Sequence, residues 1–370
     1  MGDISSSVVT KSSAVTMKLV CGLDLGDKES QLCICTPEGT VVEQAKVRTT
    51  TPGFARRFQN CEPMRIALET GTHSPWVSRL LSQWGHEVLV ANPRKVRLIG
   101  NSRRKNDRLD AQSLADLLSV RARLLYPIEH VSAQAQTDRA TLQARDALVR
   151  ARASLISHAR GLVKSSGGRL PSCSAEAFAT KAKPFVPDSL APALLPMLEQ
   201  IAGMSESIRA YDKQVLELLR TSYPQAEELR RQISGVGPIT ALAFVLALGD
   251  PQRFANSRHV GAYFGLVPAQ RDSGQCTPQL GISKEGNPFV RRLLVQCAQY
   301  ILGPFGQDSD LRRFGQHIAG SGGKGKGAKK RAIIAVARKL SVVMHRLLVT
   351  KQAYQPLRSG EPGGEFQAAA

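Results

Sequence analysis

The alternation of apolar and polar residues over the first 125 residues predicts a mixed α/β domain. Period-two alternation and short apolar runs are typical of strands, whereas apolar residues three or four apart are typical of helices. The first kind of pattern predicts strands at 18–24, 31–36, 41–48, 64–69 and 86–91. The second predicts helices at 52–60, 75–84 and from Asp107 to about Val120. The predicted order is therefore β-β-β-α-β-α-β-α.

Carboxylates stand at the ends of two predicted strands and at the start of the last helix. The element order is that of ribonuclease H-like (RuvC-like) domains, in which the first and fourth strands are central neighbours. Asp24 ends the first strand and Glu69 ends the fourth, so we expect them side by side at the edge where such sheets bind ligands. Asp107 and Asp110 are three residues apart and share a helical face. Four carboxylates this close repel one another unless a cation joins them. Because Mg²⁺ prefers carboxylate and phosphate oxygens, we predict one or two Mg²⁺ ions there.

Each acid taken alone has a simpler explanation. Asp107 and Asp110 are also ordinary first-turn acids, which the helix dipole favours, and strand-end acids are common in turns. The basic sequence around the helix start supports the metal interpretation, because basic side chains would attract the phosphate groups that a bound metal ion contacts. The basic residues that we predict to contact nucleic acid here are Arg94, Lys95, Arg103, Arg104 and Lys105.

A helical arm is predicted for residues 130–230. One long helix is expected from Ala133 to about Ser165, and a second from Leu190 to Leu219. Two interpretations stay open: the pair packs on its own domain as part of a bundle, or it forms a coiled-coil arm for dimerisation. An arm would also let the first domain of one protomer meet the last domain of another.

The last domain, predicted for residues 231–350, begins with a helix-hairpin-helix signature, Ile233-Ser-Gly-Val-Gly-Pro238. Gly235 and Gly237 in the hairpin would let backbone N–H groups approach a DNA phosphate, and the following helix N-terminus adds its dipole. The alternative is a tight turn between two core helices.

A polar loop at 269–274 contains a candidate nucleophile, Ser273. A serine that attacks phosphate without a neighbouring base needs a metal or arginines to stabilise it. The alternative is a turn serine, and Ser283 is a rival candidate. We interpret the segment Gly320–Lys330 as a flexible basic linker ahead of an amphipathic helix from Ala332 to Val349. Further nucleic-acid contacts are predicted in this linker and at the start of the helix that follows the polar loop: Lys284, Asn287, Arg291, Lys324 and Lys326.

The composition points to a polyanionic partner inside a reducing compartment. The net charge is +20 and the pI is about 10.1, which favours nucleic acid. The seven cysteines have no zinc-ligand spacing, as expected for buried thiols of a protein in a reducing cytoplasm. The sequence contains no apolar run of 18 residues, so no membrane span is predicted. Residues 1–16 are interpreted as a disordered leader without the features of a secretory signal, residues 17–125 as the RuvC-like domain, and residues 355–370 as a disordered tail.

In combination these motifs resemble the IS-one-ten family of insertion-sequence transposases, the DEDD type, over roughly residues 18–350. The resemblance is carried by several short motifs in a fixed order. They are Gly22-Leu-Asp24, Ala67-Leu-Glu69-Thr-Gly71, Lys105-Asn-Asp107-Arg-Leu-Asp110-Ala111, Ile233-Ser-Gly-Val-Gly-Pro238, Phe264-Gly-Leu-Val-Pro268, Asp272-Ser273-Gly274, Ile282-Ser-Lys-Glu-Gly-Asn287 and Arg291-Arg292-Leu293.

The resemblance implies a specific chemistry. Asp24, Glu69, Asp107 and Asp110 would bind the metal, and Ser273 would form a 5′-phosphoserine intermediate with DNA during excision and insertion of the element. Many members have Ser-Ser-Gly where this chain has Asp272-Ser273-Gly274. The resemblance further implies a non-coding bridge RNA that pairs with donor and target DNA, and a homo-oligomer, dimer or tetramer, whose protomers share a site.

Two other functions fit parts of the pattern. A Holliday-junction-type endonuclease would use only the four carboxylates and metal-activated water, with Ser273 structural. A non-catalytic nucleic-acid scaffold would need none of these acids.

Overall fold

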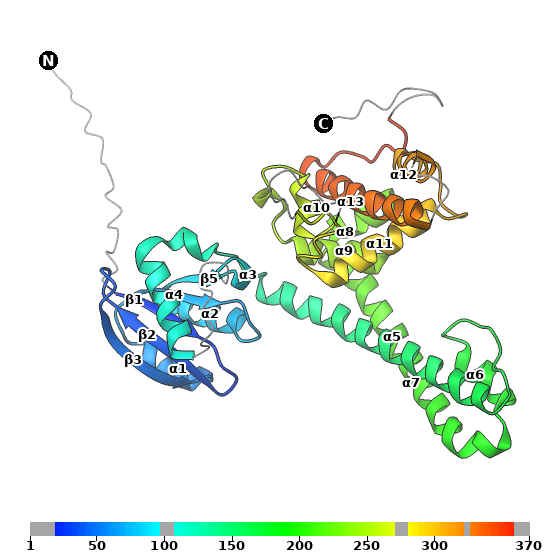
Figure 1. Ribbon diagram of the computed structural model, residues 1–370, viewed down its shortest axis with the longest axis horizontal. Coiled ribbons are helices and arrows are strands. Elements are labelled where there is room, and N and C mark those ends of the chain that lie inside the picture. The colour runs from blue at the N-terminus through cyan, green and yellow to red at the C-terminus, as the bar shows by residue number, and fades with distance from the viewer. Residues whose placement is uncertain (1–18, 97–106, 271–279, 322–325, 359–370) are drawn as a thin grey trace. The chain divides into compact units, whose positions relative to one another are not determined.

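A computed structural model describes residues 19–96, 107–270, 280–321 and 326–358. Within these ranges the side chains of Arg94, Lys95, Asp107, Arg108 and Lys326 are not described. The chain divides into two compact units, Met1–His130 and Val131–Ala370, which are described separately below (Figure 1).

The first unit contains one five-stranded sheet with the strand order β3-β2-β1-β4-β5. Strands β1 to β3 are antiparallel, and β4 and β5 run parallel to β1. The predicted strand order and the central pairing of the first and fourth strands are therefore confirmed. The strands are β1 (Val20–Asp24), β2 (Glu29–Cys35), β3 (Val41–Arg48), β4 (Arg65–Glu69) and β5 (Glu87–Ala91).

Helices cover both faces of this sheet, and each face has its own apolar core. Cys21, Leu23 and Leu68 pack on one face under α1 (Thr51–Phe58) and α2 (Ser74–Gln83). Val20 and Ala67 pack on the other face under α4 (Asp107–Arg121). The central strands β1, β2 and β4 are largely buried because both of their faces are covered, whereas the edge strand β3 is mostly exposed. The short helices α3 (Pro93–Val96) and η1 (Ala122–Leu125) flank α4 in sequence.

In the second unit, two long helices run antiparallel to each other: α5 (Ala133–Ser165) and α7 (Ala191–Thr221) (Figure 1). Arg145 donates to Asp212 at 2.6 Å, and the buried Arg152 donates to Ser205 at 3.0 Å. The two positions advance in opposite directions along the helices, which fixes the antiparallel register. Apolar residues at one end pack around α6 (Phe178–Ala182), next to the short turns η2 (Lys183–Phe185) and η3 (Asp188–Leu190).

The other ends of α5 and α7 join a helical bundle. Its central helix is α9 (Pro238–Leu248), whose residues 240–248 are all buried. A helix that is apolar on every side belongs inside a core. Around it lie α8 (Pro224–Gln232), η4 (Pro251–Arg253), α10 (His259–Tyr263), α11 (Pro288–Leu302), α12 (Asp310–Ser321) and α13 (Lys326–Thr350).

One expectation for the end of the chain is wrong. The basic segment Gly320–Lys330 is not a flexible linker throughout, because α12 extends to Ser321 and α13 begins at Lys326. Ala328 and Ala332 are both buried one turn apart, so the apolar face of α13 extends into the glycine- and lysine-rich sequence. Of the predicted tail, residues 355–358 are described, and the Pro356 carbonyl accepts from the Asp310 N–H at 2.7 Å, whereas residues 359–370 lie outside the described residues.

Candidate functional site

Asp24 and Glu69 are neighbours at the carboxyl edge of the sheet. Strands β1 and β4 pair in parallel with Gly22 opposite Ala67 and Leu23 opposite Leu68, so the next residues along are Asp24 and Glu69. Side chains alternate between the faces of a strand. Glu69 shares its face with Ala67, which packs in the core beneath α4. Asp24 and Glu69 therefore project side by side on the face that α4 covers.

Helix α4 approaches this edge because Gly22 allows backbone contact. A Cβ atom at Gly22 would lie 1.9 Å from the Ala111 carbonyl oxygen and 2.6 Å from the Ala115 nitrogen. Further along α4, the Asp116 carboxylate lies close enough to Cys35 to help raise the pKa of its thiol. Cys35 pairs with Val20 at the start of β1. The helix therefore runs opposite to β1, and its first turn lies toward the end of the strand that carries Asp24.

The strand register places two of the four predicted metal ligands, Asp24 and Glu69, together at this edge. Asp24 and Glu69 are partly buried, and each takes part in an interaction with another group. Asp110 is exposed in the first turn of α4. Asp107 begins the helix, but its side chain lies outside the described residues. Among the described side chains, no group of three or more His, Cys, Asp or Glu residues is close enough to hold a metal ion.

The oxygen donors present nevertheless suit a hard divalent cation. Two adjacent carboxylates with a third on the approaching helix match the ligand preference of Mg²⁺, which keeps several waters and binds few protein groups. Without a cation the adjacent carboxylates of Asp24 and Glu69 would repel each other. The oxygen donors of these two residues fit a hard cation, and α4 carries the other two predicted ligands in its first turn.

The sequence analysis missed a contact between the loops that follow β1 and β4. The His73 Nε2 atom lies 3.7 Å from the Asp27 carboxylate. Trp76 Nε1 donates to His73 Nδ1 at 3.1 Å, so the neutral ring carries its proton on Nε2, facing Asp27. The buried Ser74 further fixes the second loop, because its hydroxyl bonds Gly71 and lies 2.9 Å from His130 Nε2. Only the sequence position after a strand-end acid could have indicated these residues.

In the second unit, the predicted hairpin is a tight turn between α8 and α9. Gly235 has a φ of +91°, and a Cβ there would lie 2.8 Å from the Tyr300 ring. Gly237 is the N-cap of α9, and a Cβ at this position would meet nothing within 4 Å. The turn therefore has open space beside the Gly237 Cα and a ring-covered face at Gly235, while the Gly237 N–H faces the buried Cys297 thiol.

The described residues on either side of the candidate nucleophile, 264–270 and 280–287, have irregular backbone. Ser273 itself lies outside the described residues. Of the polar residues predicted around it, Lys284 is exposed with a φ of +57°, Asn287 caps α11 by accepting from the Phe289 and Val290 N–H groups, and Arg291 donates to backbone carbonyls. Ser283 donates its N–H to the Val267 carbonyl at 2.9 Å.

Most of the predicted basic contacts cannot be placed. Arg103, Arg104, Lys105 and Lys324 lie outside the described residues, as do the side chains of Arg94, Lys95 and Lys326. The backbone positions of the last three are described: Arg94 and Lys95 lie in α3, and Lys326 is the first residue of α13.

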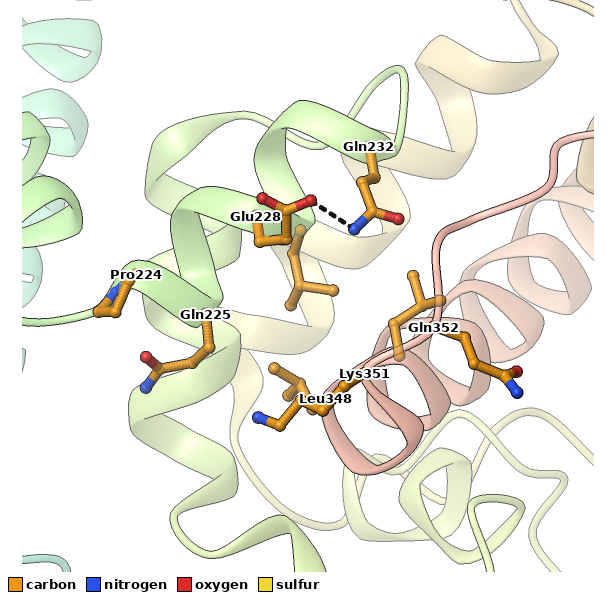
Figure 2. A pocket seen from close by; sticks show the side chains of 9 residues that line it. Pro224, Gln225, Glu228, Gln232, Leu348, Lys351 and Gln352 are labelled. Atoms are coloured by element: carbon orange, nitrogen blue, oxygen red, sulfur yellow. Dashed lines mark hydrogen bonds between the residues drawn. The ribbon is translucent and has the colours of Figure 1, made fainter.

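A pocket of 310 Å³ lies between α8 and the end of α13, and it contains none of the predicted site residues (Figure 2). Leu229, Leu347 and Leu348 contribute its apolar lining, and Gln232 donates to Glu228 at 2.6 Å on one wall. It is a shallow feature of the bundle.

No helix in the described parts of the chain has the length and apolar character needed to span a bilayer.

Comparison with known proteins relates both units to one class of enzymes. Residues 21–166 match the DEDD transposase model, and residues 227–309 match the model of the transposase IS116/IS110/IS902 family. The chain is 27% identical over 91% of its length to the transposase for insertion sequence element IS1111A of Coxiella burnetii, covering 91% of that protein. It is 29% identical over 75% of its length to the transposase for insertion sequence element IS1328 of Yersinia enterocolitica, covering 82% of that protein.

A third relative, the pilin gene-inverting protein of Moraxella bovis, is 29% identical over 40% of this chain and 46% of its own length. The predicted resemblance to the IS-one-ten transposases is confirmed by the two models, which lie in the predicted order and together span more than half of the chain. The chain therefore belongs to the IS116/IS110/IS902 family and is a DNA transposase.

Proposed function

We propose that this transposase excises and inserts its element with a metal site at the sheet edge and a serine nucleophile in the second unit. The observation that carries the first part is the register of β1 and β4, which sets Asp24 beside Glu69 on the face that α4 approaches. Asp107 and Asp110, in the first turn of that helix, complete the ligand set. The unit is then a RuvC-like DEDD domain, with a domain boundary near residue 125.

Bound Mg²⁺ would place positive charge next to the phosphodiester, where it would stabilise the negative charge that develops on a phosphodiester oxygen during the reaction. The protein groups have the complementary task of holding that ion at a fixed place. Asp24 and Glu69 are fixed by strand pairing, and the helix that carries Asp107 and Asp110 is fixed by the backbone contact at Gly22. Rigid elements of this kind hold catalytic groups more accurately than loops.

Ser273 is the proposed nucleophile. Its hydroxyl oxygen bonds to the 5′-phosphorus of the DNA, the bond from phosphorus to the 3′-oxygen breaks, and the hydroxyl proton leaves the serine while the 3′-oxygen gains one. Rejoining reverses these changes with a different 3′-hydroxyl as the attacking group. The total number of phosphodiester bonds is conserved, so strand exchange needs no external energy source.

Nucleic acid would be held by several surfaces. In the last domain, proposed for residues 231–350, the turn between α8 and α9 is interpreted as a helix-hairpin-helix. The N-terminus of α9 would meet a phosphate. Lys284 is exposed next to the proposed serine loop, and the basic sequences near α3 and α13 would follow the backbone of DNA or RNA.

A guide RNA and an oligomer complete the proposal. The net charge of +20 is large enough to serve a structured RNA as well as DNA. The antiparallel α5–α7 pair in residues 130–230 is an extended arm with a separate apolar core at its far end. Such an arm suits contact with a second protomer, so that the carboxylates and Ser273 of one site come from two chains.

The decisive experiment traps the covalent intermediate. The full-length protein is incubated with junction DNA of its element, Mg²⁺ and the flanking transcript, then denatured and analysed by mass spectrometry. A DNA adduct on Ser273, absent from Ser273→Ala, is the expected result. Cut DNA without an adduct would instead favour the endonuclease mechanism with a water nucleophile. Omission of the transcript tests the need for RNA, because the proposal expects strand exchange to stop.

A further inference from the structure

Two backbone segments meet in direct contact next to the start of α11. Gly265, with a φ of +67°, approaches Glu285 so closely that a Cβ would lie 2.2 Å from the Glu285 carbonyl oxygen. Gly286, with a φ of +75°, lies against Tyr263, and a Cβ there would be 1.8 Å from the Tyr263 carbonyl oxygen. Both glycines adopt left-handed conformations that other residues rarely adopt, so the contact is specific to this sequence.

The same two segments pair as a short antiparallel ribbon. Ser283 donates to Val267, Lys284 donates to Gly265 at 3.2 Å, and Ala269 donates to Gly281 at 2.8 Å. Residues 269 and 281 are therefore adjacent, and the chain between them carries Ser273. Whatever the conformation of that connecting chain, both of its ends start from this ribbon.

One arginine links the two segments to a rigid helix. Arg291 Nη1 donates to the Phe264 carbonyl at 3.0 Å and to the Glu285 carbonyl at 2.8 Å, which gives it one acceptor in each segment. The residue lies in the first turn of α11, and helical side chains point back toward the helix N-terminus. The neighbouring Val290 and Leu294 are buried in the core, so α11 is a fixed base for the guanidinium.

We propose that Arg291 is a positioning residue that fixes the base of the loop carrying the serine, whereas the sequence had suggested a nucleic-acid contact. The proposal deepens the proposed function, because its catalytic consequence requires Ser273 to be the nucleophile. Both carbonyls that Arg291 engages come from irregular backbone, where no helix or sheet partner is available to them. Loss of the guanidinium would free the two segments to separate and would move the loop ends.

The test compares Arg291→Gln with Arg292→Gln in the full-length protein. Arg292 is the matched control because it is the next residue of α11 and pairs with Asp146 of α5 instead of the ribbon. Hydrogen exchange of the Ser283 and Lys284 amides is measured first. These amides should exchange at least tenfold faster in Arg291→Gln and at the wild-type rate in Arg292→Gln, because only the first change releases the ribbon.

Two further measurements separate positioning from phosphate binding. The rate of adduct formation on Ser273 should fall about 10²-fold in Arg291→Gln, since a displacement near 1 Å has this effect on reacting groups. The dissociation constant for junction DNA and its salt dependence should stay within twofold of wild type. Unchanged amide exchange with weaker DNA binding and a salt slope smaller by about one would overturn the proposal, because that is the signature of a phosphate contact.

The readouts also separate this proposal from the serine mechanism. Faster exchange in Arg291→Gln, in a protein that never forms an adduct, would support the role of Arg291 at the ribbon and contradict Ser273 as nucleophile. If Arg291→Gln does not fold, Arg291→Lys replaces it. The lysine ammonium group is compact and does not reproduce the planar, forked donor geometry of the guanidinium. Amide exchange should therefore be faster than in wild type but by less than the tenfold expected for complete loss of the contact. Wild-type exchange rates in Arg291→Lys together with slower adduct formation would count against positioning.

Discussion

The sheet edge and the base of the serine loop both hold functional groups in place, but they do so through different kinds of interaction. At the edge, Asp24 and Glu69 are placed by strand register, and α4 is placed by its buried apolar face and its close approach at Gly22. At the loop base, irregular backbone is placed by two left-handed glycines and by Arg291. The first arrangement depends on repeated hydrogen bonds that no single side chain controls, whereas the second depends on a few individual residues.

The difference has consequences for mutation. Changes to the acids at the edge should alter chemistry and leave the fold intact, because the strands pair through their backbones. Changes at the loop base should alter local structure first and chemistry as a result. The predictions below address this contrast, beginning with the largest expected effect.

Replacement of Asp24 by Asn, or of Glu69 by Gln, should reduce DNA cleavage and strand transfer by roughly 10³-fold or more, because a bound metal contributes several kcal/mol to such a reaction. The thermal midpoint should not fall, since the change also removes repulsion between adjacent carboxylates. Gel-based strand-transfer assays and thermal denaturation measure the two effects. Wild-type activity in either variant would contradict the assignment of the site.

Replacement of Gly22 by Ala should destabilise the first unit and weaken metal-dependent activity together. The new methyl group would meet the α4 backbone at Ala111, and overpacking of a core contact typically costs about 1–3 kcal/mol. Gly203→Ala in α7 is the control, because a Cβ there meets nothing within 4 Å and should stabilise by about 0.4–1 kcal/mol. Denaturant unfolding checks both, and equal stability of the two variants would mean that α4 does not need this contact.

At the loop base, Lys284→Gly should leave stability unchanged or raise it by up to about 1.5 kcal/mol. Glycine relieves a left-handed conformation that costs other residues about 1–2 kcal/mol, but it also gives up about 0.5–1 kcal/mol through the unfolded chain. Lys284→Ala keeps the strained conformation and removes the charge. Nucleic-acid binding that is weaker in both variants would identify Lys284 as a contact, whereas loss of stability in the glycine variant would contradict the conformational explanation.

The smallest effect concerns acid stability. Hydrogen bonds from Arg230, and further ones from Arg231, lower the pKa of Glu227 in α8 from 4.5 to about 2. A lowered pKa stabilises the folded state above the unfolded pKa, and this stability is lost as pH falls from about 4.5 toward 2. Both arginines are partly exposed, so the contribution should stay below about 1 kcal/mol. Glu227→Gln should flatten unfolding free energy against pH in this window, and an unchanged slope would argue against the ion pairs.

The contrast also explains what the sequence could predict. Apolar periodicity predicts strands and helices, and the strand order then places Asp24 beside Glu69 without any knowledge of side-chain contacts. The long helix α5 was predicted with its observed limits because no glycine or proline interrupts its first seven turns. By contrast, the start of α13 was predicted too late, because the glycines and lysines at 320–330 outweighed the buried Ala328.

The roles of Asn287 and Arg291 could not be predicted from the sequence either. A basic residue in a predicted DNA-binding region suggests a phosphate contact, and only the structure shows the carbonyls of Phe264 and Glu285 within reach of the Arg291 guanidinium. The same holds for the contact of His73 with Asp27, which joins two loops that are far apart in sequence. Such contacts depend on how irregular segments meet, and periodicity contains no information about that.

Metal binding at the sheet edge is the most direct test of the central claim. Mn²⁺, which substitutes for Mg²⁺ and is visible by electron paramagnetic resonance, is titrated into the full-length protein bound to junction DNA, and Asp24→Asn and Glu69→Gln are compared with wild type. We expect saturable binding in wild type and at least tenfold weaker binding in both variants. Equal Mn²⁺ affinity in all three proteins would show that Asp24 and Glu69 do not hold the metal.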